Sequence, residues 1–149
     1  MSLRDRPALV AGTLAVVGYA ATICLRAWQD KSGASFGEAL GANAVLYAIL
    51  LLISCVIYFA CAMTFIGWST FVPTTMLQVC AAYGLTFAAA TIIYMFPIPM
   101  VSWLMTVVVL LVLLVKLVDL EATEAMIVAV LVMFTRAMLM IWFLEPALS

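Results

Sequence analysis

The sequence predicts an all-α, polytopic integral membrane protein, a helical bundle with five transmembrane helices. Hydrophobic residues make up 69% of the 149 residues and charged residues only 9%. A soluble domain carries about 25% charged and about 45–50% apolar residues. The apolar runs are also unbroken rather than alternating, which favours helices over a β-barrel. Lipid is therefore the expected solvent for most of this chain.

The first predicted span covers about residues 7–28, because a spanning helix needs about 20 mostly apolar residues. Arg26 and Trp28 near its end are typical of an interfacial anchor. The start of the chain, with Arg4 and Arg6 before an apolar run, also resembles a signal peptide. The run is longer than the roughly 7–15 residues of a signal-peptide core, which favours a retained transmembrane helix.

The second span is predicted at about 36–66 and has a clear start. Ser35 followed three residues later by Glu38 is the pattern of a capping box, in which each side chain bonds the other residue's backbone N–H. The segment is longer than the hydrocarbon requires. We therefore expect either a tilted helix or a first turn that lies in the interface.

Three further spans follow, at about 73–96, 100–118 and 121–144. The prolines at 97 and 99 separate the third from the fourth, since each disfavours helical geometry in its predecessor. Pro146 is expected to follow the end of the fifth. The links are short, so neighbouring spans should be antiparallel and residues 1–149 should form a single transmembrane domain.

Small residues recur at helical spacing on three of the five segments. Such stripes let helix backbones approach closely in lipid. Segments one, two and three are therefore expected to form the packed centre, with the fourth facing lipid or a partner because its 107–115 run is all valine and leucine. The predicted packing residues are Ala11, Ala15 and Gly18 on segment one, Gly37, Gly41, Ala44 and Ala48 on segment two, and Gly84 and Ala88 on segment three.

Arg136 is the most informative single residue, because it lies near the middle of the fifth segment. An arginine at mid-membrane costs at least about 2.5–3.5 kcal/mol on insertion scales, so it needs a partner or water. If the second segment starts at the end where the fifth finishes, Asn43 and Glu38 lie at comparable depth. We predict that Arg136 pairs with Asn43, with Glu38 as countercharge. The alternative is an arginine that snorkels to headgroups or to backbone carbonyls.

Four charged residues gather between the fourth and fifth segments. Lys116 and Asp119 have the i,i+3 spacing of an ion pair at a helix end. Asp119 is a candidate cap for the fifth helix, and Glu121 and Glu124 suit its positive N-terminal dipole. A local structural role accounts for all four, although an acidic cation-binding mouth is the alternative.

The composition excludes several kinds of chemistry. The chain has no histidine, so histidine-dependent catalysis, haem ligation and zinc-protease motifs are ruled out. No metal site, cofactor or catalytic residue is predicted, and a net charge of −1 gives no reason to expect nucleic-acid binding. The cysteines (Cys24, Cys55, Cys61 and Cys80) form no CxxC pair and are interpreted as small buried hydrophobes.

Two functional hypotheses follow. The first is a small non-catalytic protein that acts as a structural or assembly subunit, with the lipid bilayer and either copies of itself or other membrane subunits as partners. The second is an oligomeric channel or small-solute transporter with a polar path lined by Asn43, Gln78, Thr86, Thr91 and Arg136. The convergence of these side chains on one wet cavity would favour transport.

Location and orientation follow from the charged ends of the segments. A bacterial inner or plasma membrane is expected. With the N-terminus inside, Arg4, Arg6 and Lys116 are cytoplasmic, whereas Arg26 and Lys31 lie on the other side. The positive-inside rule therefore favours a cytoplasmic N-terminus by three basic residues to two.

Overall fold

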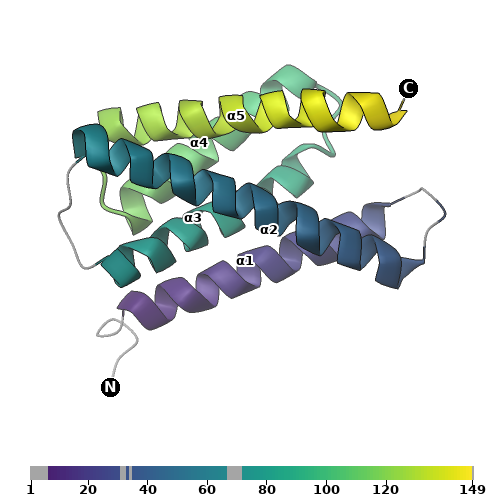
Figure 1. Cartoon of the computed structure of the whole chain (residues 1–149), viewed down its shortest axis with the longest axis horizontal. Coiled ribbons are helices and arrows are strands. Elements are labelled where there is room, and N and C mark those ends of the chain that lie inside the picture. Colours follow the sequence, from purple (N-terminus) through teal and green to yellow (C-terminus); the bar gives the residue numbers. More distant parts are fainter. Residues whose placement is uncertain (1–6, 31–32, 34, 67–71, 149) are drawn as a thin grey trace.

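The computed structural model describes residues 7–30, 33, 35–66 and 72–148, and over these residues it is helical with no strand. The five expected helices are present, and each contains a stretch long and apolar enough to cross a membrane. Figure 1 shows the bundle. Its helices are α1 (Pro7–Gln29), α2 (Phe36–Cys61) with a π-helical continuation η2 (Ala62–Ile66), α3 (Val72–Ile93), α4 (Pro99–Leu117) and α5 (Ala122–Leu148).

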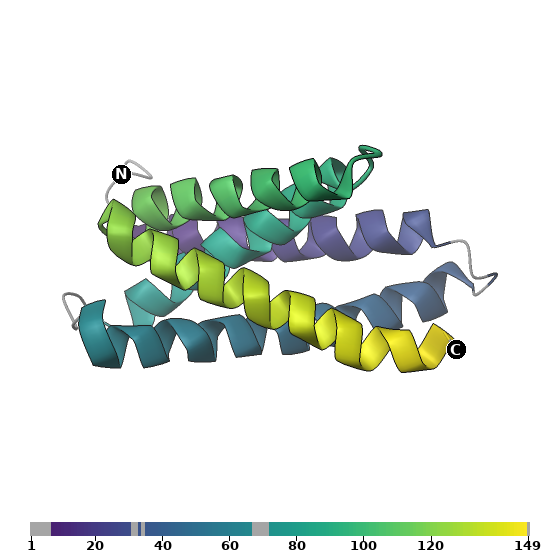
Figure 2. The same cartoon turned by 90° about the horizontal axis from the view of Figure 1, so that it is seen from above.

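The helices alternate in direction, so α1, α3 and α5 run one way and α2 and α4 the other (Figures 1 and 2). As a result α1 begins at one end of the bundle and α5 finishes at the opposite end. The central helix is α3, which packs against α1, α4 and α2. Its inward side chains are fully buried at Val79, Ala82, Tyr83 and Ala90.

The closest helix–helix approach joins α1 to α3, which share the most extensive contact in the bundle. A Cβ added to Gly18 would lie 2.6 Å from the carbonyl carbon of Gly84, and one added to Gly84 would lie 3.1 Å from the carbonyl oxygen of Ala15. Two of the small-residue stripes therefore meet backbone to backbone. Ala11 on the same face of α1 is buried, and Ala88 on α3 is half-buried.

The stripe on α2 does not pack inside the bundle, contrary to the sequence-based expectation. A Cβ built on Gly37 or on Gly41 meets no atom within 4 Å, and Ala48 is exposed. Ala44 is half-buried, and its carbonyl oxygen accepts a hydrogen bond from the Tyr19 hydroxyl of α1. The α2 core is built instead from larger side chains such as Tyr47, so the small residues point outward.

The expectation that the fourth segment faces lipid or a partner holds for one face of α4, where Val108 and Val112 are exposed, and fails for the opposite face. Ser102, Thr106, Leu110 and Leu114 form a buried row at four-residue spacing on α4. The hydroxyl of Ser102 donates to the carbonyl oxygen of Ile93 at 3.2 Å, which joins the start of α4 to the end of α3. The small side chains Ser102 and Thr106 precede the valine-leucine run at 107–115, which has no small residue of its own.

Helix ends explain the remaining differences in the boundaries. The capping box is present: the Ser35 backbone N–H donates to a carboxylate oxygen of Glu38 at 3.0 Å, and the Glu38 N–H donates to the Ser35 hydroxyl. Helix α3 ends at Ile93, three residues before the predicted end, in a tight turn toward Pro97. Helix α5 continues through Pro146 to Leu148, since a proline in the last turn removes only one backbone donor.

The α4–α5 turn differs from the predicted capping. Asp119 has a backbone φ of 62°, in the left-handed region, and follows Val118, which caps α4. The residue at the N-cap of α5 is Glu121, whose carbonyl oxygen accepts from the Ala125 N–H. Glu124 accepts the Glu121 N–H at 3.2 Å. Asp119 therefore shapes the turn rather than capping α5.

The four cysteines are free thiols with different environments. Cys55 and Cys61 are buried, Cys80 is half-buried and Cys24 is exposed, so the expected burial fails for Cys24. The Sγ atoms of Cys55 on α2 and Cys80 on α3 lie 3.7 Å apart. This contact shows that α2 and α3 are directly packed at that level.

Candidate functional site

A cavity of about 460 Å³ is lined by residues of α1, α2, α4 and α5 and by Tyr94, the residue after α3. It lies toward the end of the bundle where α1 and α3 finish. This volume is in the range of small-molecule sites. We call it the dibasic cavity because two arginines line it. Its lining residues are Arg26, Leu46, Tyr47, Tyr94, Trp103, Met133, Arg136 and Ala137.

Arg136 projects from α5 into the interior of the bundle. Its guanidinium carbon lies 5.0 Å from the ring centroid of Phe87 on α3, in a cation–π contact. The same Phe87 ring packs against Tyr47 of α2, with centroids 5.6 Å apart. Phe87 therefore holds both side chains in place, and the arginine is directed inward rather than toward lipid.

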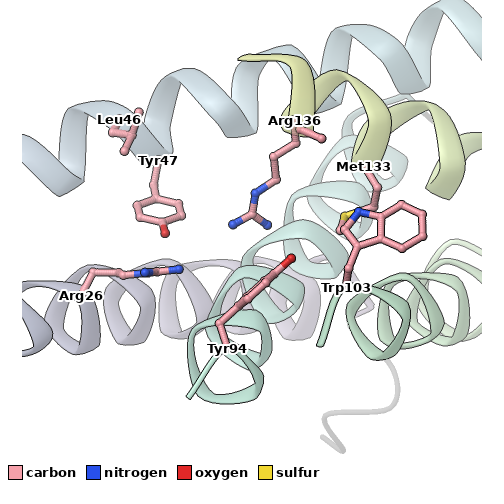
Figure 3. A pocket seen from close by; sticks show the side chains of 8 residues that line it. Arg26, Leu46, Tyr47, Tyr94, Trp103, Met133 and Arg136 are labelled. Carbon is pink, nitrogen blue, oxygen red and sulfur yellow. The ribbon is translucent and has the colours of Figure 1, made fainter. Parts of the chain in front are cut away.

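The other polar groups approach from different elements (Figure 3). Arg26 comes from the last turn of α1, and Tyr94 follows directly after the last residue of α3. In Figure 3 the guanidinium groups of Arg26 and Arg136 and the hydroxyls of Tyr47 and Tyr94 converge on the same space. Trp103 of α4 borders this space on the side of Met133.

The electrostatics of the dibasic cavity are one-sided. Arg26 and Arg136 are both positively charged and therefore repel each other, whereas Tyr47 and Tyr94 bring neutral hydroxyl groups to the cavity. No carboxylate is among the residues that line the cavity. The Nη1 atom of Arg136 and the Nε atom of Arg26 are buried without a hydrogen-bond partner. Unpaired buried donors on charged groups are costly, so this arrangement is suited to an incoming anion.

The predicted partners of Arg136 lie elsewhere. The side-chain amide of Asn43 donates to the backbone carbonyl of Ala39 at 2.8 Å, on its own helix. Glu38 is exposed and accepts from Ser35. Neither residue lines the dibasic cavity, and the surroundings of Arg136 are aromatic instead.

Sequence reasoning missed Arg26, Tyr47 and Tyr94 as members of this site. Arg26 was interpreted as an interfacial anchor, and the tyrosines carry no motif. One signal was available: Arg26 and Arg136 lie in spans of the same direction, Arg26 in the last turn of its span and Arg136 just past the middle of its own. Two arginines directed into one bundle need compensation, which acids, aromatic rings or an anion can supply.

The residues proposed for a polar transport path do not converge. The hydroxyls of Thr86 and Thr91 donate to carbonyl oxygens of their own helix, those of Ala82 and Phe87. Asn43 is likewise satisfied locally. Of that set, Arg136 alone lines the dibasic cavity.

Metal binding receives no support in the part of the chain that the structure describes. No three histidine, cysteine, aspartate or glutamate side chains are grouped there in a way that could hold a metal ion. Comparisons of the chain with protein-family models, with curated proteins and with solved structures gave no match. The geometry of the dibasic cavity is therefore the main indication of function.

Proposed function

We propose that this is a non-catalytic membrane protein whose role depends on holding an anionic group in the dibasic cavity. The observation that supports the proposal is the convergence of Arg26 and Arg136, each with a buried unpartnered nitrogen, on a cavity that no carboxylate lines. Guanidinium groups bind phosphates and carboxylates through paired N–H donors.

The energetics favour a ligand over a purely structural role for the two arginines. Bringing one arginine into the membrane already costs at least about 2.5–3.5 kcal/mol on insertion scales. The Phe87 ring returns about 1–2 kcal/mol of this for Arg136. An anion between the arginines would satisfy the free donors and remove their mutual repulsion, so the bound state should be clearly the more stable one.

The test is a thermal-unfolding titration of the full chain in a neutral detergent. The probes are inorganic phosphate, glycerol 3-phosphate and a short-chain phosphatidic acid. At least one probe at 100 times its Kd should stabilise the wild type by about 2.7 kcal/mol, a rise in Tm of several degrees. The Arg26→Gln variant should lose most of this rise in Tm. The Lys116→Gln variant should keep it, because Lys116 is exposed in the last turn of α4, at the end of the bundle away from the cavity.

The proposal is overturned if each of the three probes raises the Tm of the wild type no more than it raises the Tm of the Arg26→Gln variant. A shift that is equally reduced in Lys116→Gln would indicate general charge screening and would count against a site.

The dibasic cavity also bears on orientation. If Arg26 serves the cavity, it no longer counts as a loop charge, and the balance becomes Arg4, Arg6 and Lys116 against Lys31. Of these, Arg4, Arg6 and Lys31 lie outside the described residues. The positive-inside rule then favours a cytoplasmic N-terminus more strongly, and we place the cavity in the non-cytoplasmic half of the membrane.

Assembly remains a second candidate because one observation favours it. The outward stripe of Gly37, Gly41 and Ala48 meets no packing partner within the described chain. Small residues at this spacing promote helix association in lipid. If α2 associates with a copy of itself or another subunit, Gly41→Leu should convert the oligomer seen by native mass spectrometry into monomer. A wild type that is monomeric in several gentle detergents would reject this candidate.

A further inference from the structure

We infer that the anionic group held in the dibasic cavity is the phosphate of a membrane lipid, with a preference for a terminal phosphate monoester such as that of phosphatidic acid. This inference rests on the proposed function and names its ligand class. The charge and directions of the donors, their depth in the bundle and the apolar walls of the cavity support it.

The donor set fits a phosphate better than a carboxylate. Arg26, Tyr47, Tyr94 and Arg136 reach the space from α1, α2, the end of α3 and α5, and so approach from several directions. A phosphate presents its oxygens tetrahedrally, whereas a carboxylate presents two in one plane. A phosphate monoester carries a charge of about −1.5 to −2 at neutral pH, which matches two guanidinium groups.

The depth of the site fits a lipid headgroup. Arg26 is three residues from the last residue of α1, Tyr94 follows α3 directly, and Trp103 is in the first turns of α4. These three positions are at helix ends, where headgroups lie, whereas Arg136 is 12 residues before the last residue of α5 and therefore deeper. Phe87, beneath Arg136, is six residues before the end of α3, or about 9 Å deeper along the helix. The cavity therefore extends from headgroup level into the hydrocarbon.

The remaining walls are apolar and reach the outside of the bundle. Leu46, Trp103 and Tyr94 are each between 37% and 40% exposed, so the cavity opens past apolar and aromatic side chains. A phosphate would fill only part of a cavity of about 460 Å³. The rest suits the glycerol and the first carbons of an acyl chain.

A second apolar surface lies on the exposed side of α5, where Met138 and Trp142 are exposed. This α5 groove has a volume of about 290 Å³ and is lined by Thr135, Met138, Leu139 and Trp142. Thr135 and Leu139 also line a small hollow that Arg136 borders. The groove shares no lining residue with the dibasic cavity, so it is a separate apolar surface of α5 rather than a continuation of the cavity.

The experiment is lipid binding by native mass spectrometry on the full chain released from neutral detergent. The probes are phosphatidic acid, phosphatidylglycerol and phosphatidylcholine with identical acyl chains, together with glycerol 3-phosphate. We expect one tightly bound phosphatidic acid, weaker phosphatidylglycerol and the weakest binding by phosphatidylcholine, whose choline cation the arginines repel. Glycerol 3-phosphate should bind at least about 100-fold more weakly, because it lacks the buried chain.

The variants locate the site. Arg136→Gln and Arg26→Gln should each weaken phosphatidic acid binding by about 10- to 100-fold, the effect of losing a charge-assisted hydrogen bond. Lys116→Gln should leave the affinity for phosphatidic acid within about twofold of the wild-type value, because Lys116 is exposed at the far end of α4. The order of affinities of the three lipids is measured on the wild type alone. The inference therefore stays testable if a variant fails to fold.

Two outcomes would overturn the lipid assignment. One is phosphatidylcholine binding as tightly as phosphatidic acid. The other is glycerol 3-phosphate binding as tightly as the lipid with full dependence on Arg26 and Arg136, in which case the proposed anion site stands but its ligand is soluble. If no probe depends on either arginine, the proposed function fails as well.

Discussion

Substitution of Gly18 by alanine should destabilise the protein by several kcal/mol, the largest effect we expect from a single added methyl group. The new Cβ would lie 2.6 Å from the carbonyl carbon and 2.9 Å from the carbonyl oxygen of Gly84, and 2.7 Å from the backbone nitrogen of Leu85. These are backbone atoms, which cannot rotate away as a side chain can. Relief requires α1 and α3 to separate along their shared contact.

The magnitude follows from two opposing terms. Alanine favours a helix over glycine by up to about 1 kcal/mol. Overpacking costs about 1–3 kcal/mol where side chains can adjust, and more where backbone must move. The steric term therefore dominates at Gly18.

Unfolding in mixed micelles, followed by tryptophan fluorescence, measures this loss. Gly12→Ala is the matched control on the same helix, because its Cβ meets only a Leu77 methyl at 3.8 Å, an ordinary contact. Gly84→Ala, with a 3.1 Å approach to the Ala15 carbonyl oxygen, should fall between the two. Equal stability of the Gly12 and Gly18 variants would mean that the α1–α3 crossing is looser than the structure places it.

The sequence predicted the spans well because lipid imposes a simple rule on them. Each helix must satisfy its backbone internally, so length and hydropathy are enough to identify it. The misplaced ends at Ile93 and Leu148 depend on local turn geometry near Pro97 and Pro146. Such ends are determined by individual hydrogen bonds that hydropathy does not report.

Packing was harder to predict. A stripe of small residues shows that a helix can approach another helix closely, but it does not show which helix is the partner. Gly18 and Gly84 met each other, whereas Gly37 and Gly41 met nothing within the described chain. All three stripes satisfy the same spacing rule. The difference depends on the crossing of α1 with α3, which is a property of the whole bundle.

The site was only half visible in the sequence. Arg136 was identifiable because its depth alone makes it costly. Its surroundings were not, because aromatic residues are common in every spanning segment and the Phe87 ring and two tyrosines carry no motif. Arg26 was overlooked because an arginine near a helix end has an ordinary explanation as an anchor.

Replacement of Arg136 by methionine should stabilise the ligand-free protein and abolish its response to anionic lipid. Methionine is unbranched and fills irregular apolar space. The change removes a buried charge with an unpartnered Nη1, worth about 2.5–3.5 kcal/mol on insertion scales, and loses a cation–π contact of about 1–2 kcal/mol with Phe87. The expected net gain is about 1–2 kcal/mol in neutral detergent.

The sign of this change separates a binding role from a structural one. With phosphatidic acid present, the wild type should gain stability and the Arg136→Met variant should not, so the order of the two Tm values reverses between the two conditions. Lys116→Met removes the same charge from an exposed position and should shift neither value by more than about a degree. If Arg136→Met instead unfolds the protein in neutral detergent, Arg136 is a structural support of the α2, α3 and α5 contacts. Its free nitrogen then carries no functional meaning.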